Sequence, residues 1–183
     1  MSWKGEALAI TIERICLDHA ESYHKLLDIV GRERKYFSYF EAPALEKIKN
    51  FVSDNLANGS PHFVALAGGE LVGSCEIERS NLPVHSHVGS LDMAVLPDYR
   101  GKGIGRSLID AALSDDRRLG LARVGLGVFA DNSRAIALYE LVGFKREGLL
   151  RNGACFDSRF VDTVFMGLVF EFDDPSIGKT ISR

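Results

Sequence analysis

The sequence has few cysteines and no long apolar run. Its three cysteines, Cys16, Cys75 and Cys155, are far apart and odd in number, and no two of them form a C-x-x-C pair. This spacing argues against a zinc site and against a disulfide framework, so we expect reduced, buried thiols in a cytoplasmic protein. No apolar run approaches the length of about 20 residues that a membrane-spanning helix needs. We therefore expect no membrane partner.

The chain also lacks a marked excess of charge of either sign. It carries 22 Lys and Arg against 25 Asp and Glu, which gives a net charge of -3 at pH 7. Its basic clusters contain or adjoin acids, whereas nucleic-acid-binding proteins present uncompensated basic patches. We expect no nucleic-acid partner. The first twenty residues contain acids and no long apolar core, so they do not resemble a signal peptide.

Length and hydrophobic pattern favour a single domain over residues 1–172, followed by a polar tail over residues 173–183. Strands are predicted over residues 8–15, 62–67, 71–77, 91–96, 123–128, 144–150 and 160–170. Helices are predicted over residues 18–30, 43–58, 104–120 and 133–142, with glycines at or just past several of their ends. The order β-α-α-β-β-β-α-β-α-β-β combines hairpins with crossovers, which predicts an α/β fold with a mixed sheet covered by helices.

The most informative stretch is residues 91–113, LDMAVLPDYRGKGIGRSLIDAAL. Its apolar start predicts a strand buried on both faces, Pro97 ends that strand, and helical spacing begins after the glycines. The first N–H groups of a helix lack internal partners, and glycines let a diphosphate approach the backbone closely. Arg100, Lys102 and Arg106 add positive charge at the same place. We therefore predict a binding site for a phosphorylated cofactor.

The type of cofactor depends on the spacing within this glycine loop. A Walker A loop ends in Gly-Lys-Ser/Thr, which is absent, and a dinucleotide fingerprint reads G-x-G-x-x-G, whereas this loop reads G-x-G-x-G. The loop resembles the R/Q-x-x-G-x-G/A signature of the GCN5-related N-acetyltransferases, with Arg100, Gly103 and Gly105 at its three fixed positions. In that family the amides of the loop hold the pyrophosphate of coenzyme A. A glycine-rich turn without a ligand is the alternative for the loop alone.

A second stretch resembles another motif of the same family, N-x-x-A-x-x-x-Y-x-x-x-G-F. Asn132, Ala135, Tyr139, Gly143 and Phe144 all match it. Two motifs at compatible separation are far more specific than either alone. The resemblance is strongest over residues 91–150, and the ending of the chain is similar to the bacterial amino-acid and ribosomal-protein acetyltransferase branches.

The resemblance implies a fold and an activity. The expected fold is a mixed, mostly antiparallel central sheet flanked by about four helices. The expected activity is transfer of an acetyl group from acetyl-CoA to a primary amine, directly, in a ternary complex and without a metal. The acceptor is a small amine, an amino acid or a peptide N-terminus, and the family also suggests a homodimer. The alternatives are a non-catalytic acyl-CoA sensor and a dinucleotide-dependent oxidoreductase.

The resemblance also implies which residues hold the cofactor. In the family, the strand matching residues 93–95 splays from the strand before Asp131, so that free backbone groups bind the pantetheine. The residues implied in cofactor binding are Met93, Ala94, Val95, Arg100, Gly101, Lys102, Gly103, Ile104, Gly105, Arg106, Asn132, Ala135 and Tyr139. Tyr139 is expected to protonate the departing sulfur, since a phenol is protonated at neutral pH. Its alternative role is a core position on the apolar face of its helix.

The amine must lose a proton before it attacks, because an alkylammonium has a pKa of about 10.4. Asp92 and Glu78 are our candidates for the base; Glu76, His85 and His87 lie nearby in the sequence. For each of them a solvated or hydrogen-bonded side chain is the alternative.

Residues 33–40 mix aromatic and charged side chains between the first two helices. In the family this region walls the acceptor cleft, so we predict that Tyr36, Phe37 and Tyr39 contact the acceptor. The alternative is that these rings close the core beneath the helices.

Overall fold

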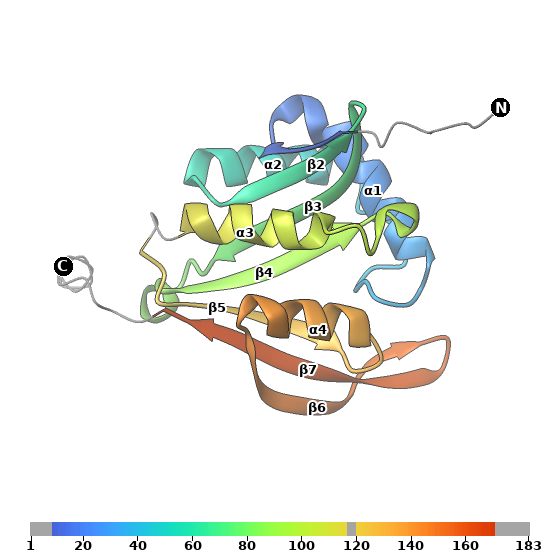
Figure 1. Ribbon diagram of the computed structural model, residues 1–183, viewed down its shortest axis with the longest axis vertical. Helices are drawn as coiled ribbons and strands as arrows, with labels where there is room; N and C mark the ends of the chain where they lie inside the picture. Colours follow the sequence, from blue (N-terminus) through green and yellow to red (C-terminus); the bar gives the residue numbers. More distant parts are fainter. Residues whose placement is uncertain (1–8, 117–119, 171–183) are drawn as a thin grey trace.

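The computed structural model describes residues 9–116 and 120–170 (Figure 1). The predicted polar tail lies outside these residues. The elements in chain order are β1 (Ile10–Arg14), η1 (Leu17–His19), α1 (Ala20–Arg32), α2 (Leu45–Asn58), β2 (His62–Ala67), β3 (Glu70–Arg79), η2 (Pro83–His85), β4 (Val88–Val95), η3 (Pro97–Tyr99), α3 (Ile104–Asp116), β5 (Arg123–Phe129), α4 (Ser133–Val142), β6 (Lys145–Phe156) and β7 (Arg159–Val169). The predicted order of strands and helices is confirmed.

The strands form one seven-stranded sheet in the order β1-β2-β3-β4-β5-β7-β6. Only β4 and β5 pair in parallel, and every other pair is antiparallel. The predicted mixed, mostly antiparallel sheet is therefore confirmed. The parallel pair needs a crossover, which α3 supplies.

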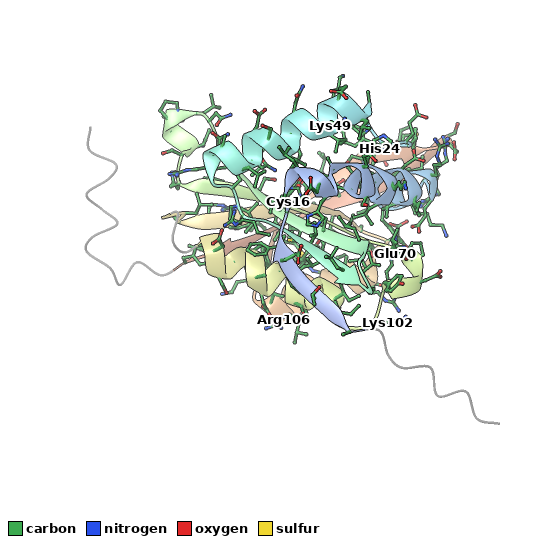
Figure 2. All side chains as sticks on the ribbon, turned by 90° about the horizontal axis from the view of Figure 1, so that it is seen from above. Cys16, His24, Lys49, Glu70, Lys102 and Arg106 are labelled. Atoms are coloured by element: carbon green, nitrogen blue, oxygen red, sulfur yellow. The ribbon has the colours of Figure 1, made fainter. Side chains whose placement is uncertain are left out.

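Helices cover both faces of this sheet (Figures 1 and 2). Side chains of α1 and α2 form one buried cluster with β2, β3 and β4, and side chains of α3 and α4 form a second cluster with β3, β4, β5 and β7. Adjacent residues of β3 therefore face different cores. Cys75 belongs to the α3 and α4 side, whereas the next residue, Glu76, accepts a hydrogen bond from Tyr23 of α1.

Three strands differ from the sequence prediction in length or burial. β4 begins at Val88 rather than at residue 91, because the small residues before Leu91, which resemble a loop, pair with both neighbouring strands. Leu91 is buried in the cluster under α3 and α4, and Ala94 is buried in the cluster under α1 and α2. The prediction of burial on both faces therefore holds for these two positions, whereas Ser90 and Asp92 are exposed. β3 continues to Arg79, and β6 continues through a register irregularity after Leu150.

The chain between α1 and α2, residues 33–44, crosses the end of α1; we call it the acceptor loop. Gly31 lies inside the last turn of α1 rather than ending the helix as predicted. A Cβ on Gly31 would lie 3.0 Å from the carbonyl oxygen of Tyr39 and 3.2 Å from the nitrogen of Glu41. The glycine thus lets the acceptor loop lie directly against the helix.

Two further sequence expectations concern the thiols and the membrane. Cys75 is buried, but Cys16 and Cys155 are exposed, so the expectation of buried thiols holds for one of the three. Across residues 9–116 and 120–170, none of the helices combines the length and apolar character that crossing a membrane requires.

Candidate active site

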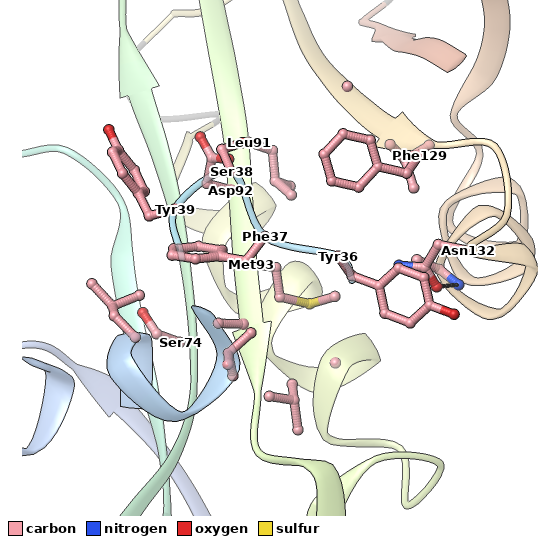
Figure 3. Close-up of a pocket in the computed structure, with 18 of the residues that line it drawn as sticks. Tyr36, Phe37, Ser38, Tyr39, Ser74, Leu91, Asp92, Met93, Phe129 and Asn132 are labelled. Atoms are coloured by element: carbon pink, nitrogen blue, oxygen red, sulfur yellow. Dashed lines mark hydrogen bonds between the residues drawn. The ribbon is translucent and has the colours of Figure 1, made fainter. Parts of the chain in front are cut away.

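A cleft opens where β4 and β5 diverge. The two strands pair only from Val88 with Arg123 to Ser90 with Gly125, so the rest of β4 has no partner on that side. Leu96 donates its backbone N–H to Val72 of β3, and successive residues of a strand point their amides to opposite sides. The amides of Met93 and Val95 therefore face the cleft. A cavity of about 1400 Å³ lies here, lined by β3, β4, β5, α4, the glycine loop and the acceptor loop (Figure 3).

The glycines of the loop have different functions. Gly101 and Gly103 adopt positive φ angles of 76° and 84°, which favour glycine. No heavy atom lies within 4 Å of a Cβ placed on Gly103, so open space adjoins its backbone. A Cβ on Gly105 would instead lie 3.0 Å from Leu138 Cδ2 and 3.3 Å from Met93 Sδ. Gly105 thus allows α3 to pack closely against α4 and β4.

The first turn of α3 offers backbone donors beside this space. The first helical hydrogen bond runs from the Ser107 N–H to the Gly103 oxygen, at 3.1 Å. The amides of residues 104–106 precede it and lack helical partners, as at every helix start. Together with the positive end of the helix dipole they suit a diphosphate.

Two of the three predicted cations of the loop are engaged within the protein. Arg100 Nε donates to the Val95 carbonyl oxygen at 2.8 Å, and its Nη1 donates to Glu33 Oε2 at 2.9 Å. Arg106 Nε donates to the carboxylate of Asp110, at 2.7 Å from Oδ2. Arg100 therefore ties the end of β4 to the acceptor loop.

Two cations beside the glycine loop, Lys102 and Arg134, have no ionic partner among the described residues. The Lys102 Nζ lies 5.1 Å from the ring centroid of Tyr99. The guanidinium of Arg134 lies 3.5 Å from the position that a Cβ on Gly101 would take, and Arg134 lines the cavity. The sequence analysis missed Arg134. Its signal was a cation in the first turn of a helix, where the dipole disfavours positive charge unless an anion binds nearby.

Tyr139 of α4 is buried in the core cluster and also lines the cavity. The residue is 7 % exposed, and within the described part of the chain its hydroxyl has no hydrogen-bond partner. Burial, together with Cys75 and Asp92, raises the pKa of its phenol. An unpaired buried polar group costs about 1–3 kcal/mol. A ligand in the cavity that accepts this hydrogen bond would remove that cost, so the hydroxyl fits a cofactor site.

Asn132 is the N-cap of α4, and its Oδ1 accepts a hydrogen bond from the Ala135 N–H at 3.2 Å. Its Nδ2 remains as a donor, and both residues line the cavity (Figure 3). The amide thus positions α4 and still offers one donor to a ligand.

Three carboxylates lie along the wall of the cavity on the α1 and α2 side. Glu76 and Asp92 are cross-strand partners on β3 and β4, and Glu78 follows on the same face of β3. Burial and the neighbouring Asp92 raise the pKa of Glu76 to about 8. Desolvation, followed by the charge of Glu78, raises the pKa of Asp92. His85 and His87 precede β4 and do not line this cavity.

The predicted acceptor contacts all line the cavity (Figure 3). Tyr36 and Tyr39 are 40 % and 56 % exposed, so they do not close a core. Phe37 is half-buried and packs against the α1 and α2 cluster, so the alternative role applies to this ring in part.

The acceptor loop is attached to the tip of the β6–β7 hairpin. Arg34 forms a two-pronged ion pair with Asp157, with Nε 3.0 Å from Oδ2, and its guanidinium stacks 4.1 Å from the ring centroid of Phe40. Phe40 packs on Phe156 at a centroid distance of 6.0 Å, and Phe156 packs on Phe129 of β5 at 5.1 Å. These contacts close one side of the cleft.

A doubly wound dinucleotide-binding domain needs a sheet of mostly parallel strands, and this mostly antiparallel sheet does not fit that class. An open strand edge beside a helix N-terminus fits an acyltransferase that uses acyl-CoA. A model of the Acetyltransferase (GNAT) family matches residues 21–144. The chain belongs to this family, and the resemblance inferred from the two motifs is confirmed.

Sequence relatives carry out related acetyl transfers. The L-amino acid N-acetyltransferase AaaT of Escherichia coli is 27 % identical over 86 % of this chain and 99 % of its own. The N-alpha-acetyltransferase RimI of Mycobacterium tuberculosis is 42 % identical over 52 % of this chain and 60 % of its own length.

Solved structures share the fold. The protein yncA of Salmonella typhimurium, solved with its cofactor acetyl-CoA, has a TM-score of 0.85 at 19 % identity and covers 91 % of this chain and 98 % of its own. A phosphinothricin acetyltransferase of Sinorhizobium meliloti, also in complex with acetyl-CoA, has a TM-score of 0.83 at 21 % identity, covering 88 % of each chain. Neither the oxidoreductase nor the sensor gains support from these comparisons.

Proposed function

We propose that this protein transfers the acetyl group of acetyl-CoA to a primary amine, directly and in a ternary complex. The observation that carries the proposal is the unpaired edge of β4, which leads from the acidic wall of the cleft to the glycine loop. Family membership supports both the activity and the cofactor. Acetyl-CoA supplies an acetyl group activated as a thioester.

The chain offers donors for the pyrophosphate and for the pantetheine of this cofactor. The amides at the start of α3 and the glycine loop would hold the pyrophosphate, with Lys102 and Arg134 as the cations free to approach it. The amides of Met93 and Val95, which face the cleft, would bind the extended pantetheine and polarise the acetyl carbonyl. Asn132 would contribute its free Nδ2.

Tyr139 is proposed to donate a hydrogen bond to the sulfur as the carbon–sulfur bond breaks. A free thiol has a pKa of about 8.5 and a phenol one of about 10. Because burial raises the pKa of Tyr139 further, its proton is held too tightly for complete transfer to be downhill. Stabilisation of the developing thiolate by this donor is therefore its main contribution.

The charges of the cleft suggest the class of acceptor. Within the described residues, Glu78 and Asp92 make no ion pair, and Lys47 is the cation that lines this end of the cavity. A free amino acid would place its carboxylate among these acids, whereas a peptide N-terminus or a simple amine carries no such group. We therefore propose an acceptor without a carboxylate next to its amine.

The first test measures coenzyme A release from acetyl-CoA with purified protein and a panel of amino acids, amino-acid amides, polyamines, aminoglycosides and short peptides. Tyr139→Phe should lower kcat on the preferred acceptor, while its melting temperature should not fall below that of the wild type. Turnover by alaninamide above that by alanine would support the acceptor class. Binding without any turnover would favour the sensor, and absence of acetyl-CoA binding would refute the proposal.

A homodimer and a cytoplasmic location remain predictions. Light scattering coupled to gel filtration tests the first, and cell fractionation tests the second.

A further inference from the structure

Glu76 is held by partners from other elements of the fold. Its side chain is 13 % exposed, and its Oε2 accepts a hydrogen bond from the Tyr23 hydroxyl at 3.0 Å. His62 Nε2 lies 3.2 Å from the same oxygen. The other oxygen, Oε1, has no hydrogen-bond partner among the described residues, and Glu76 lines the cavity. One oxygen is thus fixed and the other is available.

The protonation of His62 follows from its own contacts. Asn55 Nδ2 lies 3.2 Å from His62 Nδ1, so Nδ1 accepts and the ring proton is on Nε2. Nε2 also lies 2.9 Å from Ser74 Oγ. Burial, with the nearby Arg14, lowers the pKa of His62 to about 3, so the ring is neutral. His62 therefore donates a hydrogen bond in this network and is not itself the base.

We propose that Glu76 is the general base that deprotonates the acceptor, and that Tyr23 positions its carboxylate. The inference rests on the proposed transfer to an amine. The ammonium gives one proton to Glu76, directly or through one water, and becomes a neutral amine. The nitrogen lone pair then forms the bond to the acetyl carbon while the carbon–sulfur bond breaks and its electron pair leaves with the sulfur. The newly formed amide gives its extra proton to the thiolate, so coenzyme A departs as a thiol. Glu76 then returns its own proton to solvent.

Glu76 suits this task better than our two sequence candidates because of its surroundings. The titratable groups that face it are Tyr23 of α1, His62 of β2, Glu78 on its own strand and Asp92 of β4. Burial, followed by the charges of Asp92 and Glu78, raises its pKa to about 8, close to the value at which a base is effective near neutral pH. Asp92 and Glu78 thus make Glu76 more basic.

Two variants should shift the basicity of Glu76 in opposite directions. The hydrogen bond from Tyr23 lowers the pKa of Glu76, so Tyr23→Phe should move the acid limb of the kcat/KM profile to higher pH. The charge of Asp92 raises it, so Asp92→Asn should move the limb to lower pH. A purely structural role of either residue would not produce opposite shifts.

The removal of the base itself is tested by Glu76→Gln. We expect a loss in kcat/KM of about 100-fold or more, with the acid limb gone and acetyl-CoA affinity unchanged. Glu70→Gln is the matched control, because Glu70 is an exposed glutamate at the start of the same strand (Figure 2). Carbon-13 NMR of the glutamate carboxyls in the free protein measures the pKa of Glu76 without any turnover, in the wild type and in the Tyr23 and Asp92 variants.

Each outcome decides the proposal. A titration of Glu76 near pH 8 that shifts in both expected directions, together with the loss in Glu76→Gln, supports it. Loss of activity in Asp92→Asn without a shift would assign the base to Asp92 and overturn it. Wild-type turnover with an unperturbed Glu76 would overturn the base alone, whereas binding of acetyl-CoA without turnover of any amine would overturn the proposed function as well.

Discussion

Substituting alanine for Gly103 separates backbone strain from ligand binding. The methyl group meets no heavy atom within 4 Å, so it causes no clash in the free protein. The φ angle of 84° costs an alanine roughly 1–2 kcal/mol. In a domain of this size that cost lowers the melting temperature by roughly 2–8 °C. The same methyl group projects into the space where we place the pyrophosphate.

Gly59 supplies the matched control. It has a φ angle of 69° at the end of α2, and a Cβ there also meets nothing within 4 Å. Gly59→Ala should therefore destabilise the protein by about as much as Gly103→Ala. It lies outside the cavity, so acetyl-CoA affinity should not change.

The assay is calorimetric titration with acetyl-CoA, together with a melting curve of each variant. We expect Gly103→Ala to weaken binding at least tenfold, which is about 1.4 kcal/mol, and Gly59→Ala to leave it unchanged. Wild-type affinity in both variants would refute the placement of the pyrophosphate at Gly103. A loss in both would show that strain alone affects binding.

Four further predictions follow. Arg34→Ala, which frees the acceptor loop from the hairpin, should raise the acceptor KM severalfold and leave that of acetyl-CoA unchanged. Arg134→Ala should weaken acetyl-CoA binding and reduce its salt dependence in titrations at increasing ionic strength. Glu76 has a pKa of about 8 in the folded state and of about 4.3 in the unfolded state. The stability that its protonated form contributes is therefore complete below the unfolded-state pKa and lost as pH rises through the folded-state pKa. Denaturation curves should show less loss of stability between these pH values in Glu76→Gln. Finally, initial rates with both substrates varied should give intersecting lines, whereas parallel lines would indicate a covalent intermediate.

The sequence predicts those parts of the site whose residues lie close together along the chain. The glycine loop and the start of α3 are contiguous, and Asn132 and Tyr139 lie on one helix, so spacing alone relates them. The sheet was predictable in the same way, since each strand carries its own apolar pattern. The start of β4 and the end of β6 were not predictable, because pairing with neighbouring strands includes residues there whose sequence resembles a loop.

The base lies beyond such local patterns. Tyr23 and Glu76 are 53 positions apart, and they meet only because α1 packs on the face of β3 that carries Glu76. His62 and Asp92 reach the same place through strand register. The sequence of β3 does not distinguish the two glutamates, because Glu76 and Glu78 are two residues apart and point to the same face of the strand. Burial of one and exposure of the other comes from the helices above them.

The two faces of the sheet explain why we place the chemistry at the gap between β4 and β5. Tyr139 belongs to the core under α3 and α4, whereas Glu76 is held by α1 on the opposite face. A continuous sheet would separate them. Pairing of β4 and β5 stops after Ser90, and from there a molecule bound along β4 can approach both groups. The glycine loop leads into α3 on one face and the acceptor loop follows α1 on the other, so there is room for both substrates to bind together. A thiol nucleophile is then unnecessary, and the buried Cys75, whose pKa is raised by burial, is poorly suited to be one.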